Sequence, residues 1–354
     1  MRPSFFNLNK KFVSLGIIAL LFVVFLFYGM NLKAAANKVP QWQAYQQRFI
    51  EKGRIIDTGN PQKISHSEGQ GYGLILASFY QDRDAFNAIW QWTQKNLQTR
   101  QDALFSWSWS PESGQVTDPN NASDGDLLIA WGLLRGFDLW HDETYQNEAR
   151  KILGAIKQKL IYTHSFYGKM LLPGEYGFLD KDKQEIVINL SYWVFPALQR
   201  FAEFEPNEPL WPELIANGKQ LLKIARFGQW NLPADWVRFS LTSRNFDLET
   251  RYAPRFSYDA LRIPLYLKWA HYEDSVLFEP FQKFWGQFQG RSTLPAWTDL
   301  KTQEVDPLNA NMAVRSIIHL VAPNIVTTLP ADNPQESYYN STLYLFSTQL
   351  AQTK

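Results

Sequence analysis

Three acidic residues lie in unusual surroundings, far apart along the chain, and they are the side chains best suited to chemistry. Glu68 lies in residues 66–73, where three glycines, an amide and an aromatic ring accompany the carboxylate. Asp124 lies in residues 122–126, and Asp259 follows an aromatic residue in 257–260. Glycines let a substrate approach the backbone closely. Separated acids among aromatic rings are what glycoside hydrolysis requires, because one carboxyl group donates a proton and another activates water.

Each acid also has an ordinary interpretation, because each stands just before an expected helix, where carboxylates commonly cap the N-terminus. For Glu68, capping competes with the role of a proton donor that burial beside aromatic rings keeps protonated near neutral pH. For Asp124, capping competes with a hydrogen bond to a sugar hydroxyl, which would hold the sugar ring in a distorted form. The local sequence leaves both interpretations open.

Asp259 differs from the other two acids because basic residues surround it in the sequence: Arg251, Arg255 and Arg262. A guanidinium close to a carboxyl group lowers the pKa of that group and keeps it ionised. An ionised carboxylate is what a base that activates water must be. Arg262 follows Asp259 by three residues, so the two can lie on one helix face, where the arginine would hold the carboxylate in place. Capping of the next helix is again the alternative.

Aromatic residues make up 16% of the chain, and 14 of them are tryptophans. Most large rings belong to the core, but flat rings also stack on the C–H faces of sugars. We expect sugar contacts from Trp107 and Trp109, which alternate in one aromatic stretch, and from Tyr192. Tyr72, beside Glu68, offers a flat face with a polar tip. Together with Arg262, these residues form the expected substrate-binding set.

Composition excludes several classes of function. The net charge of +1 gives no electrostatic footprint for nucleic acid. The absence of cysteine excludes disulfides and thiolate metal sites. The five histidines are far apart and form no HExxH-type pair, so a zinc enzyme is not expected. We therefore expect neither a metal nor a cofactor.

The N-terminus indicates export from the cytoplasm. Basic residues precede an apolar stretch, Phe12–Met30, and an Ala-rich segment follows it. Residues 1–36 therefore read as a signal peptide, although the apolar stretch approaches the ~17–25 residues of a membrane-spanning helix. A cleaved signal would leave residues 37–354 periplasmic or secreted. An uncleaved anchor would leave them outside the inner membrane, attached only through this segment.

Hydrophobic residues spaced by three and four predict a mostly helical chain. The expected helices are 41–49, 71–80, 84–97, 126–140, 148–161, 192–204, 211–227, 260–272, 275–289, 312–321 and 336–349. Strand signals are weak, apart from a small hairpin of 177–179 with 185–188. No linker divides the chain, so we expect one all-α domain of paired helices. If the pairs close into a ring, the junctions that hold the three acids share one rim; a solenoid-like stack is the alternative.

The motifs together resemble glycoside hydrolase family 8, and most closely its endo-1,4-β-glucanases associated with bacterial cellulose synthesis. The similar stretches are residues 53–57, 67–73, 122–126, 170–174, 189–192, 235–237 and 257–262. The resemblance implies an (α/α)6 barrel with a cleft across one rim and an inverting mechanism on β-1,4-glucan. It implies that Glu68 is the proton donor, Asp259 the general base, and Asp124 the acid that orients and distorts the sugar. Tyr192 and Arg262 match positions around the water and the base.

The chain departs from the family pattern at Gly132, where Ser or Ala is usual, at Gly136, where Ala is usual, and at Leu190, where Pro is often found. We expect altered packing behind the site and a slightly different Tyr192 loop, with the acids unaffected. A xylanase or chitosanase on the same scaffold is an alternative function, as is a non-catalytic glycan-binding component. The resemblance also suggests a cellulose synthase complex as a partner.

Overall fold

The structure is a computed structural model that describes residues 40–352. The expected leader, residues 1–36, lies outside the described residues. The chain divides into two units, Met1–Arg48 and Phe49–Lys354. In the first unit, the described residues 40–48 are helical. Within residues 40–352, no helix has both the length and the apolar character needed to span a bilayer.

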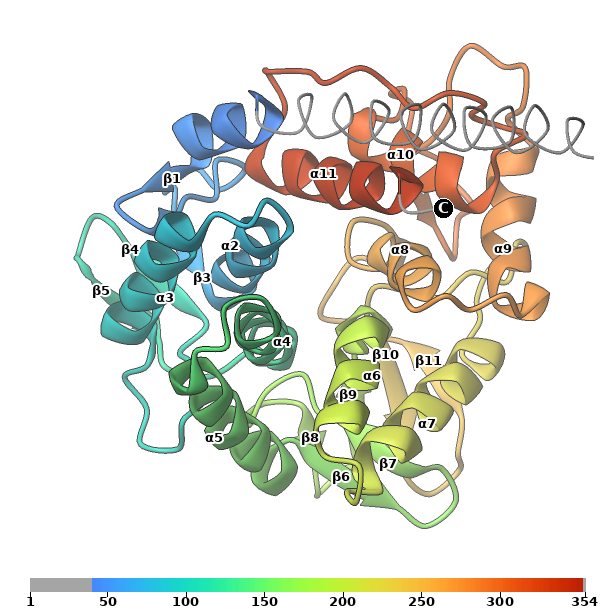
Figure 1. Cartoon of the computed structure of the whole chain (residues 1–354). Coiled ribbons are helices and arrows are strands. Elements are labelled where there is room, and N and C mark those ends of the chain that lie inside the picture. The colour runs from blue at the N-terminus through green and yellow to red at the C-terminus, as the bar shows by residue number, and fades with distance from the viewer. Residues whose placement is uncertain (1–39, 353–354) are drawn as a thin grey trace, which may run out of the picture. The chain divides into compact units, whose positions relative to one another are not determined.

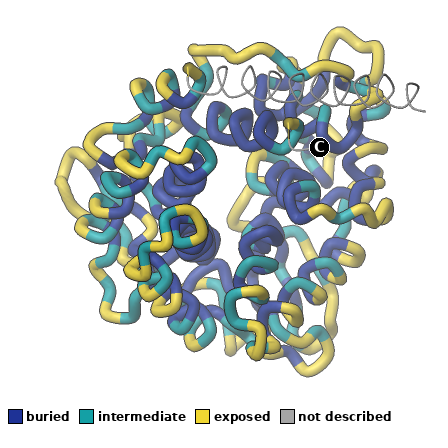
Figure 2. The backbone as a smooth tube through the Cα atoms, viewed as in Figure 1, coloured by how far each residue is buried: buried dark blue, intermediate teal, exposed yellow. Residues whose placement is uncertain are grey.

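Six inner helices form a closed ring in the described part of the second unit (Figure 1). They are α2 (Ser67–Phe79), α4 (Ser123–Trp140), α6 (Phe195–Phe204), α8 (Arg262–Trp269), α10 (Met312–Val321) and α11 (Tyr338–Gln352). Each helix contacts the next in this order, and α11 returns to α2. Figure 2 shows these helices as the most buried part of the unit. The arrangement confirms the expected mainly helical barrel and excludes an open solenoid, because a solenoid would not bring α11 back to α2.

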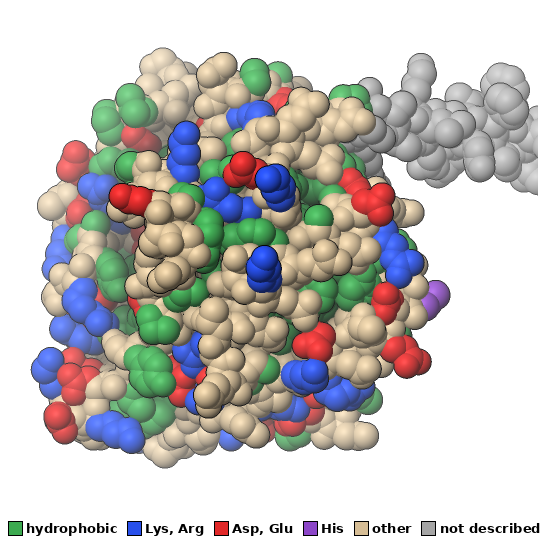
Figure 3. All heavy atoms as spheres, turned by 90° about the vertical axis from the view of Figure 1, so that its left-hand side faces the viewer, with side chains coloured by type: hydrophobic (Ala, Val, Ile, Leu, Met, Phe, Trp, Pro, Cys, Tyr) green, Lys and Arg blue, Asp and Glu red, His purple; other side chains and the backbone are tan. Residues whose placement is uncertain are grey.

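Outer helices pack on this ring and are amphipathic. They are α3 (Arg83–Leu97), α5 (Glu143–Lys159), α7 (Leu210–Ile224) and α9 (Ser275–Gly286). Three of them have an aspartate at the N-cap position, namely Asp82, Asp142 and Asp274. The side chain of each aspartate accepts a hydrogen bond from a backbone N–H of the first turn. The cap at Asp142 explains why α5 begins five residues before the predicted start. The face shown in Figure 3 mixes acidic and basic side chains, with no field of one sign.

Short antiparallel strands lie in the connections between the helices. β3 (Ser65–His66), β4 (Ser108–Ser110) and β5 (Gln115–Asp118) form one sheet. A second sheet has the order β11 (Phe246–Leu248), β10 (Val237–Ser240), β9 (Glu185–Ile188) and β8 (Leu179–Asp180). The two-stranded sheets are β1 (Ile50–Glu51) with β2 (Arg54–Ile55), β6 (Ile161–His164) with β7 (Gly168–Leu171), and β12 (Arg255–Phe256) with β13 (Thr298–Asp299). The β8–β9 pair confirms the predicted hairpin. The other strands were missed, because two to four residues are too few for a period-two pattern.

Glycines allow α2 and α4 to approach each other very closely. A Cβ atom on Gly125 would lie 2.8 Å from the backbone nitrogen of Glu68, and one on Gly132 would lie 2.7 Å from the Cβ atom of Leu74. A Cβ atom on Gly136 would lie 2.6 Å from the ring of Phe86. Gly132 therefore lies at the close contact of α4 with α2, and Gly136 lies at the contact of α4 with Phe86 of α3.

We predict that Gly132→Ala lowers the free energy of unfolding by about 1–3 kcal/mol, because the added methyl group overpacks the α2–α4 contact. The matched control is Gly154→Ala in α5, where a Cβ atom would meet nothing within 4 Å. The control should be stabilising by about 0.5–1 kcal/mol, since alanine favours the helix. Urea unfolding measures both, and equal effects of the two substitutions would contradict the close approach.

Candidate active site

One buried guanidinium gathers all three predicted acids. Arg262, the first residue of α8, is 1% exposed. Its Nη1 atom donates to Asp124 Oδ2 at 2.9 Å and to Glu68 Oε1, and its Nη2 atom donates to Asp259 Oδ1 at 3.0 Å. Ser191 Oγ accepts a further bond from Nη2 at 2.7 Å. The acids, which lie far apart in sequence, therefore meet at one cation on the rim that carries the N-termini of α2, α4 and α8.

The structure shows that Glu68 is not a helix cap. The helix α2 begins at Ser67, four residues before the predicted start, so Glu68 lies in its first turn and not in a preceding loop. The cap is His66, whose Nδ1 atom accepts a hydrogen bond from the backbone N–H of Gly69 at 3.1 Å. The Glu68 carboxylate is therefore available for other contacts, and the hydroxyl of Tyr72 donates to it at 3.2 Å.

The capping interpretation is also wrong for the two aspartates. The N-cap position of α4 is Ala122, which offers no side-chain bond, and Asp124 lies inside the first turn. The N-cap position of α8 is Leu261, again without a side-chain bond, and Asp259 lies in the turn before it. The Oδ1 atom of Asp124 accepts a hydrogen bond from the backbone N–H of Gly125 at 2.8 Å. Its Oδ2 atom, like the Asp259 carboxylate, bonds to Arg262.

Two of the three arginines expected near Asp259 point elsewhere. Arg251 pairs with Glu249 at 3.0 Å, and Arg255 lies over the ring of Trp297 at 3.9 Å. Only Arg262, among these three, bonds to Asp259. Desolvation in the site raises the pKa of Asp259, and the guanidinium offsets this only in part. The expected lowering of that pKa is therefore wrong, because burial outweighs the one arginine that reaches the carboxylate.

The cluster retains a proton near neutral pH. Burial, followed by the negative charge of Glu68, raises the pKa of Asp124 to about 7. The surrounding carboxylates raise the pKa of Arg262 well above its usual range, so the guanidinium stays charged. Three carboxylates around one cation leave excess negative charge, which favours protonation of the group. The proton belongs to the coupled cluster and not strictly to one residue.

The acids differ in how far they reach into an adjoining hollow of about 250 Å³. The side chains of Glu68 and Asp259 are 17% and 35% exposed, whereas that of Asp124 is only 4% exposed. All three line the hollow together with Arg262. Glu68 and Asp259 are therefore the carboxyl groups that a ligand or a water molecule can reach most easily.

Trp107 and Tyr192, which were predicted to contact sugar, also line the hollow. Trp107 is 36% exposed, and its indole N–H donates to Asp118 Oδ2 at 2.7 Å, which fixes the ring. Tyr192 ends a short 3-10 turn, Leu190–Tyr192, that precedes α6. These two rings give the hollow flat apolar surfaces beside its charges.

The structure does not support Tyr72 and Trp109 as direct sugar contacts. Tyr72 is completely buried, and its hydroxyl bonds to Glu68 and to Tyr266 at 2.8 Å. It therefore positions the glutamate. Trp109 packs edge-on against Trp92, with ring centroids 5.3 Å apart, and is not among the residues that line the hollow.

Sequence analysis missed several residues that contact the acids. Asn189 Nδ2 donates to Asp259 Oδ2 at 3.1 Å. The Nε2 atom of His66 lies 3.6 Å from Asp57 Oδ2, and its Nδ1 atom lies 3.8 Å from Glu68 Oε2. Burial alone would lower the pKa of His66, but the hydrogen bond with Asp57 and the charge of Glu68 outweigh burial and raise it. Both residues stand in or beside family-like motifs, and that position was the only signal available. Among residues 40–352, no three side chains are grouped to hold a metal ion.

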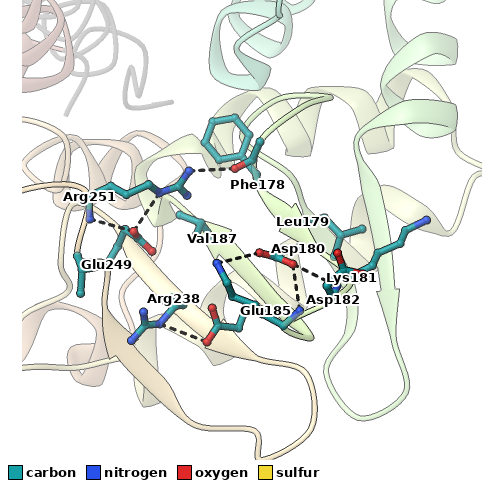
Figure 4. Close-up of a pocket in the computed structure, with 13 residues that line it drawn as sticks. Phe178, Leu179, Asp180, Lys181, Asp182, Glu185, Val187, Arg238, Glu249 and Arg251 are labelled. Carbon is teal, nitrogen blue, oxygen red and sulfur yellow. Dashed lines mark hydrogen bonds and ion pairs between the residues drawn. The ribbon is translucent and has the colours of Figure 1, made fainter.

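A second hollow, of about 520 Å³, lies beside β8, β9 and β10 (Figure 4). Several of its charged side chains are paired with one another: Arg238 Nε lies 3.7 Å from Glu185 Oε1, and Arg251 Nε lies 3.0 Å from Glu249 Oε1. None of the three predicted acids lines it. The smaller hollow at Arg262 is therefore the better candidate for chemistry.

Comparison with known proteins gives concordant results. The profile of glycosyl hydrolases family 8 matches residues 15–354. A probable endoglucanase from Novacetimonas hansenii is 36% identical over 307 residues, which cover 86% of this chain and 88% of the relative. An endoglucanase from Cellulomonas uda is 38% identical over 271 residues, 76% of this chain and 73% of the relative. The solved structure of an endo-beta-1,4-glucanase from Acetobacter xylinum has a TM-score of 0.83 at 34% identity, covering 89% of this chain and 98% of that one.

We predict that Asp124→Asn stabilises the protein at alkaline pH. The pKa of Asp124 rises from 3.8 to about 7 on folding, so between these values the folded state binds more protons and stability falls as pH rises. An amide avoids this loss. At pH 8 the variant should be more stable than wild type by on the order of 3 kcal/mol, and the difference should shrink toward pH 4.

Urea unfolding at the two pH values measures this difference. Glu112→Gln, at an exposed position in the turn before β5, is the matched control and should change stability little at either pH. An Asp124→Asn variant with the same relative stability at pH 4 and pH 8 would contradict the assignment of a buried, proton-retaining carboxyl group.

Proposed function

Because this chain belongs to glycosyl hydrolase family 8, we propose that it hydrolyses internal β-1,4-glucosidic bonds of cellulose-type glucans. The structural observation that carries the proposal is the cluster of three carboxyl groups on Arg262, which opens into a hollow with aromatic sides. The relative from Novacetimonas is a probable endoglucanase, that from Cellulomonas is an endoglucanase, and the solved relative from Acetobacter is an endo-beta-1,4-glucanase.

In this proposal Glu68 protonates the leaving glycosidic oxygen. Its carboxyl group borders the hollow, and Tyr72 and Arg262 hold its Oε1 atom. Asp124 binds the same guanidinium nitrogen as Glu68. A proton that moves from Asp124 to Glu68 therefore leaves the net charge of the cluster unchanged.

Asp259 is the proposed base that activates water. It is the most exposed of the three acids, and Arg262 and Asn189 each hold one of its oxygen atoms. Glu68 and Asp259 bind different terminal nitrogens of one guanidinium, so the arginine lies between them and keeps them apart. Inverting glycosidases require such a separation, ~6.5–9.5 Å, because a water molecule must fit between the base and the sugar.

Asp124 and the two rings would position the sugar. Asp124 is too deeply buried to reach the leaving group easily, but its carboxyl group borders the hollow and can accept a hydrogen bond from a sugar hydroxyl. Trp107 and Tyr192 provide the flat surfaces on which glucose rings stack. A bond to Asp124 that strengthens in the transition state would help to distort the ring.

The alternatives are separable by substrate. A xylanase or chitosanase on the same scaffold would prefer xylan or chitosan to carboxymethyl cellulose, and a non-catalytic glycan-binding component would release no sugar from any of them. The cluster of three acids argues against simple binding, because a binding surface gains nothing from a buried group with a retained proton.

We also propose that the protein is exported and acts on glucan chains made by a cellulose synthase complex. The support is the basic and apolar N-terminal sequence and the family resemblance. N-terminal sequencing of the mature protein distinguishes the two routes, since a start near Asn37 means cleavage and a retained Phe12–Met30 stretch means an anchor.

We predict that Glu68→Gln lowers the turnover of carboxymethyl cellulose by several orders of magnitude, because the amide cannot donate the proton. Release of reducing ends measures the turnover, and Glu112→Gln is the control that should keep wild-type activity. With cello-oligosaccharides, NMR should show the α-anomer as the first product of wild type, as inversion of a β-linkage requires. Undiminished turnover in Glu68→Gln, or initial release of the β-anomer, would contradict the proposal.

A further inference from the structure

Another buried acid, Asp235, binds the short segment that carries Asp259. Asp235 is 7% exposed. Asp235 Oδ1 accepts hydrogen bonds from the backbone N–H groups of Ser257 and Ala260, both at 2.9 Å. Its Oδ2 atom accepts from the hydroxyl of Ser257. One carboxylate thus binds the backbone on both sides of Asp259, and this fixes where the Asp259 side chain emerges.

The next residue along the chain contacts Asp259 itself. The side chain of Trp236 lies beside the Asp259 carboxylate and favours its ionised form. The indole ring is held by stacking on Tyr252, with centroids 4.6 Å apart, and on Phe178, with centroids 5.9 Å apart. Asp235 and Trp236 are adjacent residues that directly precede β10. Asp235 therefore binds the backbone around Asp259, and Trp236 lies beside the carboxylate of the same acid.

We infer that Asp235 and Trp236 are a positioning pair for Asp259, a role that rests on the proposed function of Asp259 as the base. Asp235 sets the conformation of the turn 257–260, and Trp236 sets the direction of the carboxylate. Arg262 and Asn189 complete the surroundings of that carboxylate. Displacement of a reacting group by about 1 Å can lower a rate about 100-fold, so such a pair is expected to affect the chemical step.

The two acids are close enough for their charges to interact. Burial raises the pKa of Asp235 to about 7, and the negative charge of Asp259 is the second cause. Because both carboxylates are held together against this repulsion, the contacts of Asp235 with the backbone of the turn must compensate for it. An amide at position 235 would keep an oxygen atom for both N–H groups while removing the repulsion.

The first test compares two substitutions at position 235. Asp235→Ala removes the acceptor for both N–H groups, and we expect kcat to fall about 100-fold with KM changed less than about twofold. Asp235→Asn keeps an acceptor and should recover most of the lost kcat. Trp236→Phe keeps a ring but loses the indole N–H, and should lower kcat about tenfold. The control is Asp82→Ala, which removes an equivalent backbone cap at α3 and should leave kcat unchanged.

The second test asks whether Asp235 acts through Asp259. Each change at position 235 is combined with Asp259→Ala, and residual turnover of carboxymethyl cellulose is measured. If the pair positions the base, Asp235→Ala should add less than about a threefold loss in this background, because the group it positions is gone. A merely structural role would instead lower kcat by the same factor in both backgrounds.

The outcomes separate the two hypotheses. Wild-type kcat in Asp235→Ala and in Trp236→Phe, or an equal loss with and without Asp259, would overturn the positioning role alone. Full activity in Asp259→Ala would overturn the proposed function. If Asp235→Ala does not fold, Ser257→Ala and Trp236→Phe carry the same test, because each removes a single polar group from the assembly.

Discussion

The buried guanidinium of Arg262 is the interaction on which the rest of the site depends. A buried charge is unfavourable unless it is paired and hydrogen-bonded. Three carboxylates and a serine hydroxyl meet this requirement for Arg262. The same arrangement leaves more negative than positive charge, and this favours a retained proton. One residue therefore joins three distant segments, and the burial of the acids and the charge of Glu68, which together outweigh its cation, retain the proton that acid catalysis would use.

The scaffold makes this junction possible through close helix packing. The contact of Gly125 with the backbone of Glu68 brings the first turns of α2 and α4 together, and the closed ring brings α8 to the same rim. Each helix contributes the positive end of its dipole to the region where the carboxylates gather. Short strands between the helices then shape the walls, with Trp107 between β3 and β4 and Tyr192 before α6.

The sequence was sufficient to find the acids but not their surroundings. Glu68, Asp124 and Asp259 were recognisable because each stands among residues that an ordinary helix end does not need. The start of α2 was missed because its cap is a histidine, outside the usual Ser, Thr, Asp and Asn. Proximity in sequence suggested Asp259 as the partner of Arg251 and Arg255. Their actual partners, Glu249 and Trp297, could be assigned only in three dimensions. Tyr72 was misjudged because no local pattern shows which face of α2 meets Tyr266.

The central claim is that one cation holds three buried carboxyl groups together, and the pH dependence of stability in Arg262→Met tests it most directly. Loss of the guanidinium should cost about 3–5 kcal/mol of unfolding free energy at pH 8, where the carboxylates would remain buried and uncompensated. As the pH falls through the raised pKa values of Asp124 and Asp259, these two acids become neutral, so the cost should become small. Urea unfolding of wild type and variant from pH 4 to pH 8 measures this difference. A loss of stability that is the same at every pH would contradict the account, because it would assign Arg262 a role in packing and not in holding the acids.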